Sequence, residues 1–115
     1  VEFDQTRLDP RPALVDSGAD ATLIPVALLE EVGAWKSGNA SIRSHFGESQ
    51  KVDLYLVSLH VDGRVLPGIY VVGDPSVREV VLGRDVLNKI TLFLDGPEEQ
   101  TYLLDEATVK RLRGA

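Results

Sequence analysis

The stretch that most constrains this chain runs from residue 13 to residue 25, Ala-Leu-Val-Asp-Ser-Gly-Ala-Asp-Ala-Thr-Leu-Ile-Pro. Its first three residues are apolar, which is typical of a buried strand. Asp16, Ser17 and Gly18 follow at once and predict a turn, because Asp and Ser side chains hydrogen-bond their own backbone and Gly permits unusual dihedral angles. The sequence therefore predicts that the carboxylate of Asp16 is held at the end of a strand.

Two short motifs resemble the signatures of one protein family. Asp16-Ser17-Gly18-Ala19-Asp20 resembles the Asp-Thr/Ser-Gly-Ala motif of retropepsin-like aspartic proteases. Residues 80–87, Val-Val-Leu-Gly-Arg-Asp-Val-Leu, resemble the second signature of that family, in which two apolar residues and Gly precede Arg-Asp/Asn and a short helix. One short motif is weak evidence, because Asp-Ser-Gly is common in ordinary turns, but here both motifs occur in the family's order and at a family-like separation. The resemblance covers about residues 1–104.

Strand patterns dominate the chain. We expect strands at 1–3, 14–15, 22–24, 53–61, 64–72, 79–82, 91–94 and 101–104, a hairpin at 42–52, a loop at 37–41, and helices at 26–32, 84–89 and 106–112. Asp62-Gly63 predicts a hairpin turn, Pro67-Gly68 a bulge or an edge strand, and Asp105 a helix cap. The predicted fold class is all-β with two or three short helices, a small closed or nearly closed barrel of the retropepsin (acid protease) type. We expect one protease domain at 1–104 and a C-terminal helix or tail at 105–115.

Composition and charge exclude several kinds of partner. The formal net charge of −6 argues against nucleic acid, which favours a basic surface. No apolar run approaches the roughly 20 residues needed to span a bilayer, so no membrane segment is expected. The chain has no cysteine, and its two histidines, His45 and His60, lie in no cluster with ligand spacing, so we expect no metal and no cofactor. No signal peptide is visible in the first residues, and a cytoplasmic location is the default expectation.

Peptide hydrolysis by aspartates requires two carboxylates that share a proton. One acts as general base on a water molecule, and the other, protonated, polarises the scissile carbonyl. The chain has one Asp-Ser-Gly and is too short for two such lobes, so the second aspartate must come from a second copy. We therefore expect a two-fold symmetric homodimer with a catalytic Asp16 pair on its axis. The alternative for Asp16 is an exposed acid in an ordinary turn.

The resemblance implies supporting roles for the residues around Asp16. Ser17 would hydrogen-bond across the dimer axis, although it could also be an ordinary turn hydroxyl. Gly18, followed by Ala19, would leave room for the substrate backbone. Arg84 would form a partly buried ion pair with Asp20 at the base of the site, and a structural role for that pair is favoured over substrate contact.

A mobile hairpin over the site, the flap, is expected at about residues 42–52. Gly47 at its tip would allow close approach to a bound peptide, and the alternative is a plain exposed hairpin. The predicted substrate contacts are mainly apolar residues of two strands and the flap tip, namely Leu23, Ile24, Val81, His45, Phe46, Gly47 and Glu48.

The sequence thus predicts an aspartic endopeptidase that forms a homodimer and acts on a peptide or protein substrate. One alternative is a non-proteolytic dimerisation or peptide-binding module that keeps the retropepsin fold, although Asp16, Ser17 and Gly18 are all intact. A second is an acidic binding protein with a fortuitous Asp-Ser-Gly, which leaves Gly83-Arg84-Asp85 unexplained. The flap carries one glycine where viral members often have several. The segment 91–115 also differs from their short closing strand.

Overall fold

The computed structural model describes residues 7–43 and 49–114 of the 115-residue chain. Strands make up most of it, and three short helices complete it, in agreement with the predicted all-β class. The elements follow in the order β1 (Ala13–Val15), β2 (Leu23–Pro25), α1 (Val26–Glu31), β3 (Trp35–Arg43), β4 (Ser49–Val61), β5 (Arg64–Asp74), β6 (Val80–Leu82), α2 (Arg84–Leu87), β7 (Leu92–Asp95), β8 (Gln100–Leu103) and α3 (Glu106–Gly114). The predicted strand at 1–3 lies outside the described residues.

A six-stranded sheet carries both sequence motifs. Its strand order is β1-β6-β2-β5-β4-β3, so β6 inserts between two strands that are neighbours in the sequence. Strand β6 pairs parallel with β1 and antiparallel with β2, and Val81 lies opposite Leu14 on one side and Leu23 on the other. The second motif therefore lies directly beside the first.

The predicted closed or nearly closed barrel is wrong for this chain. Within the described ranges, β1 and β3 are the two edges of an open sheet, and β7 and β8 form a separate two-stranded sheet. Closing a sheet requires its edge strands to meet with a consistent stagger. Strand β1 has only three residues and lies at the opposite end of the strand order from β3, so these two edges do not pair with each other.

Local turn signals are confirmed in the β4–β5 hairpin. Asp62 and Gly63 have φ of 48° and 86°, as a two-residue hairpin turn with two positive φ angles requires. The predicted bulge is also present, because the pairing passes from Val57–Ile69 to Leu59–Leu66 and so sets Pro67 and Gly68 against one residue of β4.

The predicted loop at 37–41 is wrong, because β3 runs through it. Asn39 pairs with Asp53 and Ala40 with Val52, and a register shift between Lys36 and Gly38 absorbs the irregular sequence. Strand propensity depends strongly on context, and the long neighbouring strand β4 overrides the weak propensity of Ser, Gly and Asn here.

The helices begin and end near their predicted limits. Helix α1 follows Pro25 at its N-cap, and the chain leaves it through Gly33 with φ of 68°. Helix α2 is shorter than predicted and ends at Leu87. Helix α3 follows Asp105, whose Oδ1 accepts a hydrogen bond from Thr108 N at 2.7 Å, so the predicted cap is confirmed.

The hydrophobic core lies between the sheet and helices α1 and α2. Its buried members are Ile24, Leu29, Val57, Leu66, Ile69, Val71, Leu82 and Val86. The strand before Asp16 is not part of it, contrary to the prediction of a buried strand: Leu14 and Val15 are 55% and 39% exposed. Strand β1 has a neighbour on one side only, which explains this exposure.

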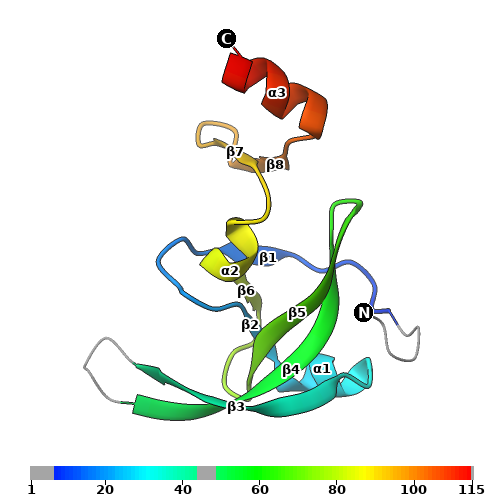
Figure 1. Cartoon of the computed structure of the whole chain (residues 1–115), viewed down its shortest axis with the longest axis vertical. Coiled ribbons are helices and arrows are strands. Elements are labelled where there is room, and N and C mark those ends of the chain that lie inside the picture. The colour runs from blue at the N-terminus through cyan, green and yellow to red at the C-terminus, as the bar shows by residue number, and fades with distance from the viewer. Residues whose placement is uncertain (1–6, 44–48, 115) are drawn as a thin grey trace.

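The C-terminal hairpin and helix α3 lie together at one end of the molecule, beyond α2 (Figure 1). Phe93 and Tyr102 face each other across this hairpin, with ring centroids 6.1 Å apart, and both are about half exposed. Among the described residues, no helix is long and apolar enough to cross a membrane.

Candidate active site

Asp16 follows β1 directly and is held by hydrogen bonds to its own turn and to β6. Its backbone N donates to Leu82 O at 3.0 Å, and its backbone O accepts from Ala19 N at 3.2 Å. Its Oδ1 accepts from Gly18 N at 2.9 Å. This is the one hydrogen bond that the carboxylate makes within the described chain, and the residue is exposed. The backbone thus fixes the carboxylate and leaves its Oδ2 available.

Backbone hydrogen bonds join the second motif to the turn that Asp16 begins. Arg84 N donates to Ala19 O at 2.8 Å. Gly83 N donates to the hydroxyl of Thr22 at 3.0 Å. The start of α2 is therefore attached to the middle and to the last residue of the segment between β1 and β2.

Two hydrogen bonds join Thr22 to Asp85 within the site. Thr22 Oγ1 donates to Asp85 Oδ1 at 2.7 Å, and Thr22 N donates to Asp85 Oδ2 at 3.2 Å. Asp85 Oδ1 also accepts from Val86 N at 2.8 Å. Thr22 is completely buried, and its hydroxyl is satisfied as both donor and acceptor.

Sequence reasoning missed the role of this pair. The sequence predicts Thr22 only as a residue of the strand at 22–24, and Asp85 only as part of the second motif. The available signal was the polar Thr22 between the turn and the apolar run of β2. Its partner could be found only once β6 was known to lie between β1 and β2.

Gly83 is required by the close approach of the two motifs. A Cβ atom at this position would lie 2.5 Å from Ala21 O and 3.0 Å from Ala19 O, which are backbone atoms with little freedom to move. At Gly18, a Cβ atom would lie 3.3 Å from Asp16 Oδ1, so a side chain there would crowd the carboxylate.

Arg84 forms an ion pair with Asp20, and this pair lies on the surface. The side chain of Arg84 is 52% exposed and that of Asp20 is 85% exposed. The sequence led us to expect partial burial, which the single chain does not provide. Solvent therefore screens the pair, and its contribution to the folding of one chain is small.

The other predicted site residues are distributed around this centre. Ser17 is exposed in the turn, and its hydroxyl has no hydrogen-bond partner among the described residues. Ala19 is half-buried. Leu23 and Val81 are half-buried and face each other across the β2–β6 pair, whereas Ile24 is 7% exposed and belongs to the core.

The predicted flap falls partly outside the described residues. Its tip residues, His45, Phe46, Gly47 and Glu48, are not described. The strands on either side, β3 and β4, pair antiparallel up to Arg43 and Ser49, as the two arms of a hairpin do.

A largely apolar groove of about 1150 Å³ lies between the segment 7–15, helix α1, strand β4 and the β7–β8 hairpin. Of the predicted site residues that the structure describes, only Ile24 lines it, but the groove reaches the surroundings of Asp16, because Val15 and Leu82 line it as well. In the described ranges, no group of three His, Cys, Asp or Glu side chains is placed to hold a metal ion.

No model of a known protein family matches the chain, and no curated protein matches it with significant similarity.

Proposed function

We propose that this protein is an aspartic endopeptidase of the retropepsin type, and that it works as a homodimer with one Asp16 from each chain at the two-fold axis. The observation that carries the proposal is the setting of Asp16. Its exposed carboxylate is fixed by backbone hydrogen bonds at the point where the two motifs meet, and one of its oxygens makes no hydrogen bond within the described chain.

The two neighbouring acids of the site, Asp20 and Asp85, already have partners within the chain. This supports a second copy of the chain as the source of the second catalytic carboxylate. Asp20 is paired with Arg84, and Asp85 accepts three hydrogen bonds from Thr22 and Val86. A second Asp16 is the partner of matching chemistry that remains.

The edge strand before Asp16 supports a contact between copies. All three residues of β1 are exposed, including the apolar Leu14 and Val15, and the strand is paired on one side only. Open apolar edges of this kind favour association with another chain. The Ser17 hydroxyl, which has no partner in the described part of this chain, would hydrogen-bond across the axis.

In the proposed reaction, the ionised Asp16 of one chain takes a proton from a water molecule, while the protonated Asp16 of the other gives its proton to the substrate carbonyl oxygen. The water oxygen bonds to the carbonyl carbon and forms a tetrahedral diol. The diol then breaks its C–N bond as the nitrogen takes the proton from the Asp16 that had deprotonated the water. The other Asp16 takes a proton back from a diol hydroxyl, which leaves one carboxyl and one amine product and restores the pair. Leu23, Val81 and the flap would bind the side chains of the extended peptide.

Cleavage of a fluorogenic apolar peptide library from about pH 4 to about pH 7, with and without pepstatin, tests the proposal. We expect cleavage by the parent, inhibition by pepstatin, and loss of cleavage in Asp16→Asn with folding intact. Asp62→Asn is the matched control, because Asn also tolerates the positive φ of that hairpin turn. Adding an excess of Asp16→Asn chains to the parent should suppress its activity, because mixed dimers hold one ionisable Asp16 only.

The same measurements separate the enzyme from the alternative of a peptide-binding module. A parent protein that cleaves nothing at any pH but binds the same peptides would favour the module. Parental activity in Asp16→Asn would show that the catalytic assignment is wrong.

A further inference from the structure

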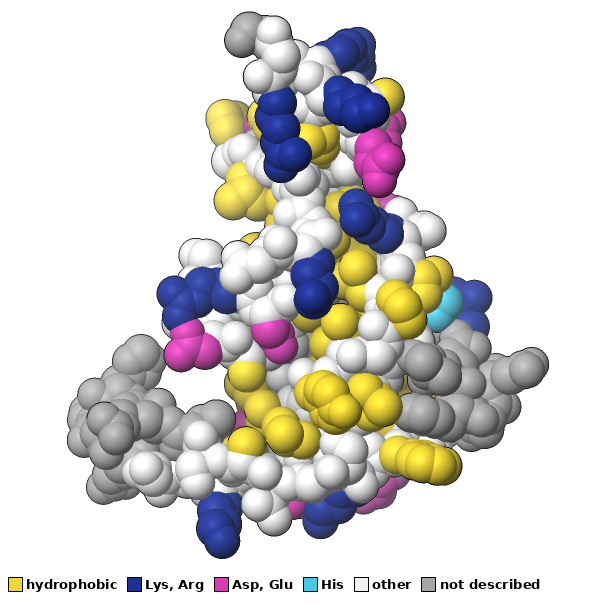
Figure 2. Space-filling model, in the orientation of Figure 1, with side chains coloured by type: hydrophobic (Ala, Val, Ile, Leu, Met, Phe, Trp, Pro, Cys, Tyr) yellow, Lys and Arg dark blue, Asp and Glu magenta, His cyan; other side chains and the backbone are white. Residues whose placement is uncertain are grey.

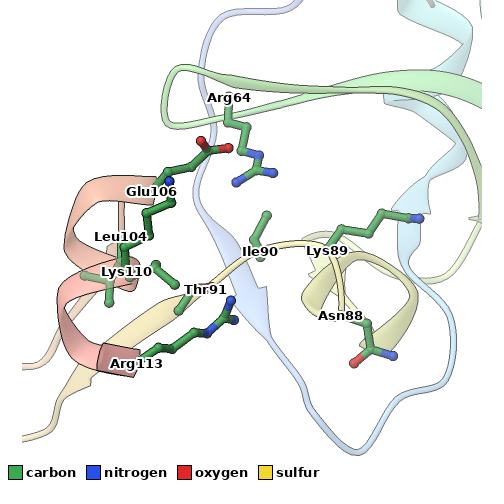
Figure 3. Close-up of a pocket in the computed structure, with 10 residues that line it drawn as sticks. Arg64, Asn88, Lys89, Ile90, Thr91, Leu104, Glu106, Lys110 and Arg113 are labelled. Carbon is green, nitrogen blue, oxygen red and sulfur yellow. The ribbon is translucent and has the colours of Figure 1, made fainter. Parts of the chain in front are cut away.

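A hollow between the β4–β5 hairpin and helix α3 has a charge opposite to that of the whole chain. It has a volume of about 360 Å³ and lies between the β4–β5 hairpin, the end of α2, the linker before β7, and α3 (Figure 3). Four of the 12 Lys and Arg residues of the chain line it, namely Arg64, Lys89, Lys110 and Arg113, but only one of its 18 Asp and Glu residues, Glu106. The hollow is thus locally basic on a protein of net charge −6.

Within the described part of the chain, none of these four cations forms an ion pair with an acid, although the carboxylate of Glu106 is directed toward Arg64 (Figure 3). The side chains of Arg64 and Arg113 point toward the hollow from two different elements, β5 and α3, whereas the side chain of Lys89 points away from the other lining side chains (Figure 3). Guanidinium groups suit planar carboxylates, which they bind through two parallel hydrogen bonds.

The rest of the hollow is apolar. Ile90, Leu104 and Val109 are half-buried and line it between the charged side chains. All five charged lining residues are exposed, and Figure 2 shows Lys and Arg side chains on the surface at this C-terminal end of the molecule. The hollow is therefore open to solvent and does not enclose a small molecule. Its size is at the lower end for ligand sites, and it suits one or two side chains of a longer segment.

We infer that this basic hollow is a docking site for an acidic peptide segment, in which carboxylates pair with Arg64 and Arg113 and an apolar side chain rests on Ile90 and Val109. Charge complementarity determines the class of partner, and the apolar floor favours a peptide over a simple anion. The site shares no residue with the surroundings of Asp16 and does not depend on the proposed peptidase activity.

Binding of a fluorescein-labelled Glu-Asp-Leu-Glu-Asp peptide to the full chain, measured by anisotropy, tests the inference. The uncharged analogue Gln-Asn-Leu-Gln-Asn should bind at least about tenfold more weakly than the acidic peptide. Added NaCl should weaken the binding of the acidic peptide only. Arg64→Gln with Arg113→Gln should raise the dissociation constant about tenfold or more. The control pair Lys51→Gln with Arg78→Gln removes the same charge from exposed positions outside the hollow. It should change the dissociation constant of the acidic peptide by less than about twofold.

Three results would overturn the inference. Equal losses in the two double variants would mean that only net charge matters. Binding of inorganic phosphate that displaces the peptide and depends equally on Arg64 and Arg113 would identify a simple anion site. Self-association that the Arg64 and Arg113 substitutions abolish, without any peptide binding, would make a second copy the occupant. Asp16→Asn should bind the peptide as the parent does, so this test is independent of catalysis.

Discussion

Thr22 and Asp85 lie 63 residues apart in the sequence and are joined by two hydrogen bonds, of 2.7 Å from the Thr22 hydroxyl and 3.2 Å from its backbone N. The same hydroxyl accepts from Gly83 N at 3.0 Å. This buried contact ties the turn of Asp16 to the start of α2, so the two motifs form one rigid unit. The position of the candidate catalytic carboxylate therefore depends on residues that do not touch it.

Thr22→Val should destabilise the protein by about 1–3 kcal/mol, because it leaves Gly83 N and part of the Asp85 carboxylate without a partner in a buried place. Urea unfolding followed by circular dichroism measures the change. Thr22→Ser keeps the hydroxyl, so its free energy of unfolding should fall much less. The control Thr101→Val, at an exposed position of β8, should stay within about 0.5 kcal/mol of the parent. Equal effects at positions 22 and 101 would contradict the assigned role.

Gly83→Ala should destabilise the fold by about 1–3 kcal/mol, because the added methyl group would overlap the backbone of Ala21. Gly96→Ala is the matched control, since a Cβ atom there meets no atom within 4 Å. Thermal unfolding of both variants tests the prediction. A Gly83→Ala protein as stable as the Gly96→Ala protein would show that the two motifs separate easily.

Features that depend on a few adjacent residues could be predicted from the sequence. The Asp62-Gly63 turn, the bulge at Pro67-Gly68 and the cap at Asp105 each follow from the backbone preferences of one or two residues, and all three are present. The pairing of Arg84 with Asp20 was expected from the family resemblance, and the chain has it, although on the surface.

Features that depend on the arrangement of distant strands could not be predicted from the sequence. The exposure of Leu14 and Val15 follows from the edge position of β1, which an apolar run does not reveal. The open sheet, and the course of β3 through 37–41, are also consequences of pairing. The Thr22–Asp85 contact needs the insertion of β6 between two strands that are consecutive in the sequence, and no local pattern encodes it.

Ser76→Ala should lower stability at neutral pH by about 0.5 kcal/mol, a value at the low end for a hydrogen bond because the site is partly solvated. The Ser76 hydroxyl donates to Asp74 Oδ1 at 2.6 Å, and this bond lowers the pKa of Asp74 below its ordinary value of 3.8. The stabilisation is present above pH 3.8 and is lost as the pH falls through the lower pKa of the folded state. The difference between parent and variant should therefore shrink below pH 3.8, whereas Ser41→Ala, at an exposed position of β3, should show no such pH dependence.

The Arg84–Asp20 ion pair provides the last prediction, which distinguishes a single chain from an assembled site. In the single chain both side chains are more than half exposed, so a double-mutant cycle of Arg84→Ala and Asp20→Asn should give a coupling free energy of about 0.2–1 kcal/mol. Urea unfolding of the four proteins at low concentration measures it, and added salt should reduce it.

The same cycle at high protein concentration tests the homodimer. Dimer formation at the Asp16 axis would remove solvent from the base of the site, and the coupling between Arg84 and Asp20 should then rise above its value in the single chain. Sedimentation velocity run in parallel measures the dissociation constant of the dimer. Arg84→Ala should weaken the dimer more than it alters the cleavage preference among peptides. A coupling that stays the same while sedimentation shows complete dimerisation would place this ion pair outside the interface.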